Sequence, residues 1–107
     1  DMVISGGVNI YPAEVEAALH AHSAVRDAAV IGVPDPHWGE SLKAVVALQP
    51  GRQATAEELM AWCGQQLADY KRPRSVDFVD ELPRDQAGKL LKRQIRAPYW
   101  EGAGRRI

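Results

Sequence analysis

Cysteine and histidine are scarce in this sequence, which holds one cysteine, Cys63, and three histidines, His20, His22 and His37. A single cysteine cannot form an internal disulfide, which excludes a disulfide-stapled scaffold. One thiol and three scattered imidazoles do not have the ligand spacing of a zinc site. We therefore expect no metal site, and we interpret Cys63 as a residue that packs a helix onto its neighbours.

Long apolar runs are absent as well. The longest, Ala28–Pro34, is far shorter than the roughly 18 residues that a membrane span needs, and the N-terminus lacks a basic and then apolar leader. Gly 9 and Pro 7 among 107 residues are too few for a disordered or collagen-like chain. The sequence predicts a soluble, cytoplasmic domain. Because Asp1 leads at once into Met2-Val3-Ile4, we expect it to be a piece of a longer protein.

Signatures of nucleotide-binding loops and of nucleophilic catalysis are also missing. Ser5-Gly6-Gly7 has neither P-loop nor dinucleotide-binding spacing, and it lies between two β-prone runs, which is typical of a tight hairpin. His20 and His22 face different directions on a predicted helix, and no serine lies in a G-x-S-x-G motif. Hydrolase chemistry is therefore not indicated.

Charge is unevenly distributed, although the formal net charge is only −1. Residues 1–70 carry 3 basic and 9 acidic side chains, whereas residues 71–107 carry 10 basic and 5 acidic ones. A basic segment of this kind favours an anionic partner, with nucleic acid, a membrane surface and a phosphorylated small molecule as the open alternatives. A solvated basic surface without a partner explains the same pattern.

Hydrophobic periodicity and turn residues predict the element order ββ-α-β-β-α-β-α. The capping box Thr55-Ala56-Glu57-Glu58 marks the start of the best-defined helix. This order predicts an α+β fold, a small domain with a mainly antiparallel three-stranded sheet plus an N-terminal β-hairpin and helices packed on the sheet. The expected elements are hairpin runs Met2–Ile4 and Val8–Tyr11, a helix from Pro12 to near Ser23, strands Val25–Val33, Ser41–Leu48 and Ser75–Val79, the helix after Thr55, and a short closing helix Leu90–Arg96.

Two sets of residues have the chemistry to bind phosphates. Gly88-Lys89 places a mobile cation in a loop rich in proline, glycine and charge. Arg72 and Arg74 stand two apart on an extended stretch, so both guanidinium groups can face one phosphate while Trp38 or Tyr70 stacks on a base. A solvated loop lysine, solvated arginines and a tryptophan that covers the sheet explain the same residues without a ligand.

Four segments of the sequence form a series of motifs: Met2–Glu16, Val30–Asp35 with Trp38-Gly39-Glu40, Tyr70–Pro73, and Leu82-Pro83-Arg84 with Gly88-Lys89. In this order and spacing they resemble the C-terminal domain of the adenylate-forming acyl-CoA synthetase (AMP-dependent ligase) superfamily. The resemblance implies a mobile lid domain over residues 1–100, a tail over residues 101–107, and a large N-terminal domain of the same enzyme outside this sequence.

This resemblance implies a ligase that joins a carboxylic acid, such as a fatty acid, to CoA in two half-reactions. In the first, the acid and ATP with Mg²⁺, bound mainly by the N-terminal domain, give an acyl-adenylate and pyrophosphate. Lys89 matches the catalytic lysine of the family. Asp85 stands where Thr or Asn is commoner in the family, which is expected to alter the turn of the loop but not the reach of Lys89.

In the second half-reaction the domain is implied to turn, withdraw Lys89 and present the glycine hairpin to the adenylate. Gly6 and Gly7 would leave room for the pantetheine arm of CoA. The remaining CoA-binding residues are implied to be Trp38 and Tyr70, which flank the adenine, and Arg72 and Arg74, which lie near the phosphates.

Three alternatives stay open. The first is the same domain from an adenylation module that loads a carrier protein, which the aromatic and arginine set suits less well than it suits an adenine with phosphates. The second is a nucleic-acid-binding module, against which the net charge of −1 and the lack of a known reader motif argue. The third is an interaction fragment without a site. The basic residues available to the second are Arg72, Arg74, Lys89, Lys92, Arg93 and Arg96.

Overall fold

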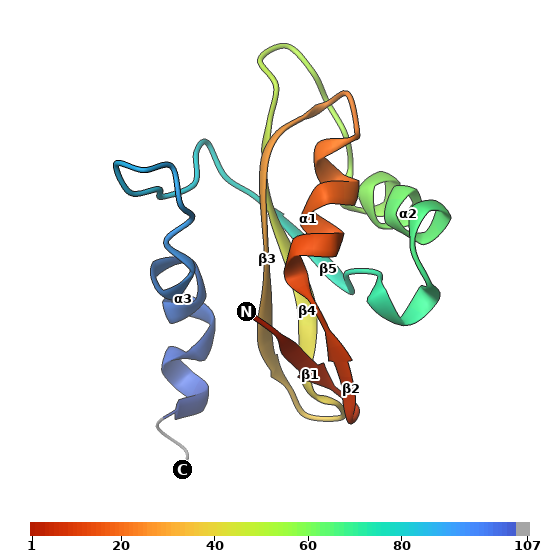
Figure 1. The fold of residues 1–107 in the computed structure, drawn as a ribbon, viewed down its shortest axis with the longest axis vertical. Helices are drawn as coiled ribbons and strands as arrows, with labels where there is room; N and C mark the ends of the chain where they lie inside the picture. The colour runs from red at the N-terminus through yellow and green to blue at the C-terminus, as the bar shows by residue number, and fades with distance from the viewer. Residues whose placement is uncertain (105–107) are drawn as a thin grey trace.

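A three-stranded sheet and a separate β-hairpin form the β-structure of the chain, whose computed structural model describes residues 1–104, with side chains up to residue 101 (Figure 1). In the sheet, β3 (Val25–Asp35) pairs antiparallel with β4 (Gly39–Leu48), and β4 pairs parallel with β5 (Ser75–Phe78). The hairpin joins β1 (Val3–Ser5) to β2 (Val8–Ile10). The predicted α+β fold is confirmed.

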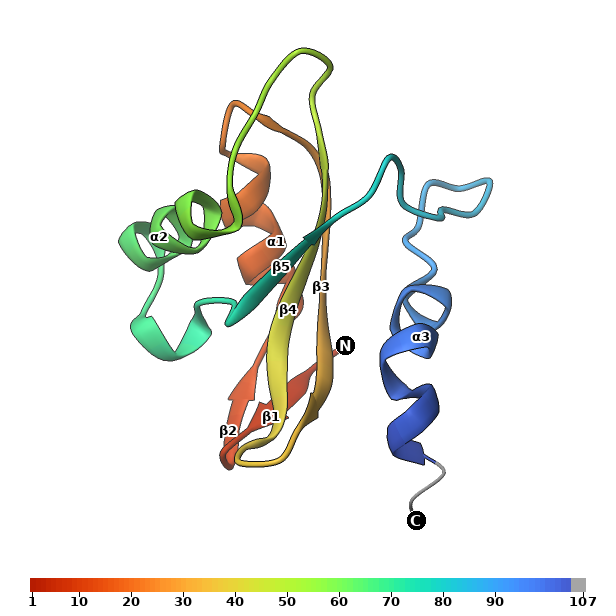
Figure 2. The same ribbon diagram turned by 180° about the vertical axis from the view of Figure 1, so that it is seen from behind.

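The strands β3 and β4 form a wall with an apolar core on each side. Because side chains alternate along a strand, Ala28 and Val30 join one core, whereas Ala29 and Ile31 join the other. Figures 1 and 2 show helices α1 and α2 against one face of the wall and α3 against the opposite face. The helices bring Val15, Leu19, Leu59 and Cys63 to the first core and Ile95 to the second.

Local sequence explains where α1 (Pro12–His20) and α2 (Ala56–Gln66) begin. Pro12 occupies the first turn of α1, where a missing N–H costs nothing. At α2, the Thr55 hydroxyl accepts from the Glu58 N–H at 3.1 Å and the Glu58 carboxylate accepts from the Thr55 N–H at 3.4 Å, which confirms the capping box. The helix α1 ends at His20 instead of near Ser23.

The strand β3 is longer than expected and irregular near its start. It continues through Pro34 to Asp35 instead of stopping at Val33, because β3 is an edge strand that tolerates a residue without an N–H. Near its start, Val25 is opposite Leu48 but Asp27 is opposite Ala47, so Arg26 is one extra residue in a β-bulge.

The closing helix is also longer than expected. The structure has α3 over Lys92–Gly104 with Pro98 inside it, where the sequence predicted Leu90–Arg96. Two contacts to the wall hold its second half: the Tyr99 hydroxyl donates to Asp77 Oδ2 at 2.5 Å, and Trp100 Nε1 donates to the Gly32 carbonyl at 2.9 Å. Burial and Asp77 raise the pKa of Tyr99 to about 12, so the hydroxyl keeps its proton. Residues 105–107 of the expected tail lie outside the described residues, and the boundary at residue 100 stays a prediction.

Candidate functional site

The first part of the candidate site is a packed group that we call the Trp38 cluster, made of Gly6, Trp38 and Arg74. The Gly6 N–H donates to the Trp38 carbonyl at 2.9 Å, which ties the β1–β2 hairpin to the β3–β4 turn. A Cβ atom on Gly6 would lie 2.6 Å from Trp38 Cε3, so the indole ring fills the space that glycine leaves. The Arg74 guanidinium lies 5.1 Å from the centre of the indole ring, in cation–π geometry.

The turn that carries Trp38 is held by Asp35. Its Oδ1 accepts from the N–H of His37 at 2.8 Å and from the N–H of Trp38 at 2.9 Å. These two hydrogen bonds to the carboxylate lower the pKa of Asp35. The turn is therefore preorganised, while the Trp38 side chain stays 39% exposed and available to a ligand.

The second part of the site is the segment between α2 and β5, which contains the 3₁₀ helix η1 (Asp69–Lys71). Pro73 in this segment is fully buried, and the Arg74 N–H donates to the Leu42 carbonyl of β4 at 2.9 Å. Lys71 forms an ion pair with Glu14 of α1 at 2.9 Å, which raises the pKa of Lys71. The segment is thus fixed to the body of the domain at both ends.

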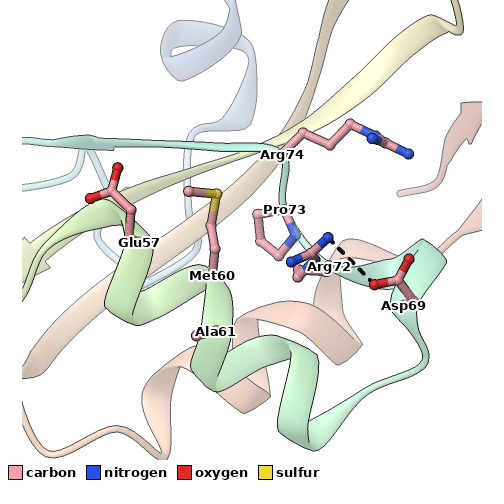
Figure 3. Close-up of a pocket in the computed structure, with 7 residues that line it drawn as sticks. All are labelled: Glu57, Met60, Ala61, Asp69, Arg72, Pro73 and Arg74. Carbon is pink, nitrogen blue, oxygen red and sulfur yellow. Dashed lines mark ion pairs between the residues drawn. The ribbon is translucent and has the colours of Figure 1, made fainter.

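A cavity of about 310 Å³ lies between this segment and α2 (Figure 3). Arg72 and Arg74 both line it, and Figure 3 shows them on either side of Pro73. Arg72 is paired with Asp69 at 3.4 Å. The other lining residues are Glu57, Met60, Ala61, Asp69 and Pro73.

The residues on the α2 side of this cavity were not predicted from the sequence. Glu57, Met60 and Ala61 have the i, i+3, i+4 spacing that places side chains on one face of a helix, and that spacing was the available clue. Gly64 has a role of the same kind, because its missing Cβ would lie 3.3 Å from Arg72 Cδ.

The structure brings most of the expected CoA-binding residues to one side of the domain. Trp38 contacts Arg74, and Arg74 shares the cavity with Arg72. Tyr70 is half exposed, is not among the cavity-lining residues, and lies beside the Lys71 ammonium at 5.6 Å from its ring centre. Gly7 has a φ of +82° and open space where a Cβ would lie.

The third part of the site is the Lys89 loop (residues 83–91), which lies between β5 and α3. Arg84 and Leu90 form an antiparallel bridge across its base, and the Leu91 N–H donates to the Pro83 carbonyl at 3.0 Å. This segment is thus a small turn closed by a single β-bridge.

The tip of the Lys89 loop is organised by Asp85. Its Oδ1 accepts from the N–H groups of Ala87 and Lys89, both at 2.9 Å, and its own N–H donates to the Lys89 carbonyl at 2.9 Å. Gly88 takes a φ of +88°, a conformation that suits glycine. Lys89 itself is exposed, and no carboxylate among the described residues pairs with its ammonium group.

The Lys89 loop lies away from the other candidate residues. Figures 1 and 2 show the Lys89 loop on the α3 side, whereas η1 and α2 lie on the other side, and the β1–β2 hairpin lies at the end of the wall beside the β3–β4 turn.

Two further features bear on chemistry. Burial raises the pKa of the Cys63 thiol to about 11, so this fully buried residue serves packing and not nucleophilic attack. Within the part of the chain whose side chains are described, no three His, Cys, Asp or Glu residues are grouped as a metal site would require. In the same part, no helix is long and apolar enough to cross a membrane.

Known proteins of similar sequence and structure share this fold. Residues 14–89 match the family described as AMP-binding enzyme C-terminal domain. A feruloyl-CoA synthase from Amycolatopsis sp is 54% identical over 99 residues, which is 92% of this chain and 20% of that protein. The fatty acid–[acyl-carrier-protein] ligase ScoC from Streptomyces coeruleorubidus is 38% identical over 107 residues, 100% of this chain and 21% of that protein.

Among solved structures, the crystal structure of Brucella canis acyl-CoA synthetase superposes with a TM-score of 0.90 at 43% identity, covering 96% of this chain and 20% of that one. The chain spans about a fifth of the length of the curated relatives it matches. With the family match over residues 14–89 and relatives more than half identical, the chain belongs to the AMP-binding enzyme C-terminal domain family.

Proposed function

We propose that this chain is the C-terminal domain of an ATP-dependent acid–CoA ligase and serves both half-reactions of that enzyme. It donates a catalytic lysine when the acyl-adenylate forms, and it presents a CoA-binding surface when the thioester forms. The observation that carries the proposal is that the Lys89 loop lies on the α3 side of the wall, whereas the hairpin and the β3–β4 turn of the Trp38 cluster lie together at the end of the wall.

Lys89 has the properties that the adenylation step requires. Its ammonium group is exposed and free of carboxylate partners among the described residues, while the backbone beneath it is fixed by Asp85. A cation held in this way can bridge the carboxylate of the acid and the α-phosphate as negative charge shifts between them. Such a preorganised group contributes about 10²–10³ to the rate.

The opposite surface has the properties that CoA binding requires. The exposed indole of Trp38 offers a stacking face for adenine, and Arg72 and Arg74 offer cations for the phosphates at the cavity beside it. Gly7 leaves open space on the hairpin for the pantetheine arm. Tyr70 extends the same surface as a second aromatic group.

The remaining groups of the reaction belong to the rest of the enzyme. ATP with Mg²⁺, and the acid that becomes the acyl-adenylate, are assigned to the N-terminal domain. The described side chains of this chain include no group of carboxylates fit to hold the metal ion. Alone, the chain is expected to be inactive, because the binding of ATP and the acid is assigned to the N-terminal domain.

The test uses the full-length parent enzyme as wild type and as Lys89→Ala. Pyrophosphate release from acid and Mg-ATP reports the first half-reaction, and thioester formation from pre-made acyl-adenylate and CoA reports the second. We expect Lys89→Ala to lose the first by about 10²–10³ and to retain the second. Equal activity of the variant in both half-reactions would refute the role of Lys89.

Loading of a carrier protein is the second candidate, favoured by the similarity to an acyl-carrier-protein ligase over the whole chain. Both acceptors carry a pantetheine arm, but only CoA carries an adenine and a 3′-phosphate. The variant Trp38→Ala separates them, since its thioester formation falls with CoA and is retained with free phosphopantetheine if CoA is the acceptor.

A nucleic-acid surface is less well supported. Lys92 is held by Asp1 and Glu16, so it does not offer a free cation to a phosphate backbone.

A further inference from the structure

The base of the Lys89 loop is tied to β3 by one arginine, Arg84. Its Nε donates to Asp27 Oδ2 at 3.0 Å and its Nη2 donates to Asp27 Oδ1 at 2.6 Å, a two-point contact that fixes the plane of the guanidinium. Its remaining terminal nitrogen, Nη1, donates to the Gly88 carbonyl within the loop. One side chain therefore joins a residue of the sheet to the residue just before Lys89.

Asp27, at the other end of this contact, is held in place by the sheet. Asp27 lies in the longest strand of the sheet, and its side chain is only 15% exposed, whereas the Arg84 side chain is 37% exposed. Asp27 Oδ1 also accepts from the Ala28 N–H at 3.0 Å. The hydrogen bond from Arg84 is the largest influence on this carboxyl and lowers the pKa of Asp27, so the carboxylate is charged at neutral pH.

The contact joins two segments that are far apart in the sequence. Asp27 and Arg84 are 57 residues apart. The hydrogen bonds around Asp85 fix the shape of the loop tip but all lie inside the loop, and Leu90 packs the base of the loop against the second core. Arg84 is the polar side chain of the loop that binds the sheet.

We propose that Arg84 and Asp27 are positioning residues for the catalytic lysine, holding the Gly88 carbonyl so that Lys89 meets the reacting phosphate in one orientation. This inference rests on the proposed function of Lys89. It predicts that loss of the Asp27 charge acts only through Lys89, and so only in the adenylation half-reaction.

The expected loss of rate comes from misorientation of the lysine. A displacement of about 1 Å in a group that must meet a transition state costs up to about a hundredfold in rate. A loop that keeps its shape but pivots on its base would move the Lys89 ammonium by such an amount, because the side chain is long. We therefore expect adenylation to fall by about tenfold or more when the contact is broken.

The experiment compares Asp27→Asn, Lys89→Ala and the double variant in the full-length enzyme, with both half-reactions measured separately. Asp27→Asn keeps the size of the side chain and removes its charge. We expect it to lower pyrophosphate release by about tenfold or more and to leave thioester formation from pre-made acyl-adenylate unchanged. In the Lys89→Ala background we expect Asp27→Asn to cause no further loss, because the lysine it positions is already gone.

Two further variants separate positioning from charge and from stability. Arg84→Lys keeps the positive charge but cannot contact both Asp27 oxygens and the Gly88 carbonyl at once, so it should lower adenylation as Asp27→Asn does. Asp77→Asn is the matched control: it removes a carboxylate that Lys43 contacts at 3.1 Å and Tyr99 at 2.5 Å, away from the Lys89 loop. We expect it to leave both half-reactions unchanged.

The inference is overturned if Asp27→Asn lowers both half-reactions in the same proportion, if it lowers the activity of Lys89→Ala by the same factor as wild type, or if adenylation keeps its wild-type rate. Failure of the proposed function would give a different result. The Lys89→Ala variant by itself would then keep its adenylation activity.

Discussion

The Trp38 cluster and the Lys89 loop each have a turn held by an aspartate, but their functional side chains are supported differently. The Trp38 indole is packed on a glycine, with an arginine stacked on its face. The Lys89 loop depends on hydrogen bonds and one ion pair, with its functional side chain left in solvent. A surface on which a flat ligand stacks needs a fixed shape. A side chain that contacts a shifting negative charge needs a fixed backbone and a mobile end.

Among the variants that test this contrast, Gly6→Ala is expected to have the largest effect. The residue has a φ of +57° and the new Cβ would lie 2.6 Å from the indole. The left-handed conformation costs about 1–2 kcal/mol for alanine, and overpacking costs about 1–3 kcal/mol more. We expect a large loss in the free energy of unfolding by urea, together with a raised KM for CoA as Trp38 moves.

Gly7→Ala is the matched control for that variant. It carries the same kind of backbone penalty, with a φ of +82°, but its Cβ meets no atom within 4 Å. It should lose only the cost of about 1–2 kcal/mol for the backbone. An equal loss in both variants would show that packing against Trp38 contributes nothing.

Next in size is Trp38→Ala. Stacking of a base on an aromatic side chain contributes about 1–3 kcal/mol, so KM for CoA should rise by about five- to 150-fold. Adenylation should be unaffected, because the Lys89 loop lies on the α3 side of the wall, away from the β3–β4 turn. Steady-state kinetics of the two half-reactions measure the split, and a parallel loss of pyrophosphate release would mean that the two regions are not independent.

A smaller effect, of about 1 kcal/mol, is expected on the stability of this chain from Asp27→Asn, since Arg84 is partly exposed to water. The pKa of Asp27 is lowered in the folded state, so its charge stabilises the fold above the ordinary carboxyl pKa of about 3.9. That contribution is lost as the pH falls through the lower folded pKa. Urea unfolding should show the variant less stable than wild type at pH 7 and equal to it below the folded pKa of Asp27; a difference that persists there contradicts this.

The smallest effect is expected from Thr55→Ala, which removes the capping box of α2. The loss should be about 0.5–1 kcal/mol in unfolding free energy. Both half-reactions should keep their rates, because Thr55 touches neither region. A change in either rate would indicate that the position of α2 matters to the site beyond its cavity-lining face.

Much of the fold could be predicted because its causes are local. Paired glycines gave the hairpin, an apolar run ended by prolines gave β3, and Thr55 with Glu58 gave the start of α2. The full length of α3 was not predicted, since the expected closing helix stopped at Arg96. Its continuation depends on Tyr99 and Trp100, whose partners are 22 and 68 residues away.

The candidate site divides in the same way. Lys89, Trp38, Arg72 and Arg74 were predicted because they belong to short motifs with recognisable chemistry. The supports of these residues were not, because each is a contact between distant segments, such as Gly6 with the indole and Asp27 with Arg84. From a sequence, reactive or ligand-binding side chains are easier to predict than the residues that hold them in position.

The bulge at Arg26 has a consequence for what can be deleted from this chain. A strand repeats every two residues, and the extra residue shifts that phase by one, so that Val25 packs with the first core although Asp27, two positions on, reaches Arg84. Removing Arg26 would make Val25 and Asp27 neighbours in an unbroken strand, where adjacent side chains point to opposite faces, so both would keep their present sides. Deletion of Arg26 is therefore expected to keep both the core packing of Val25 and the contact by which Asp27 anchors the Lys89 loop.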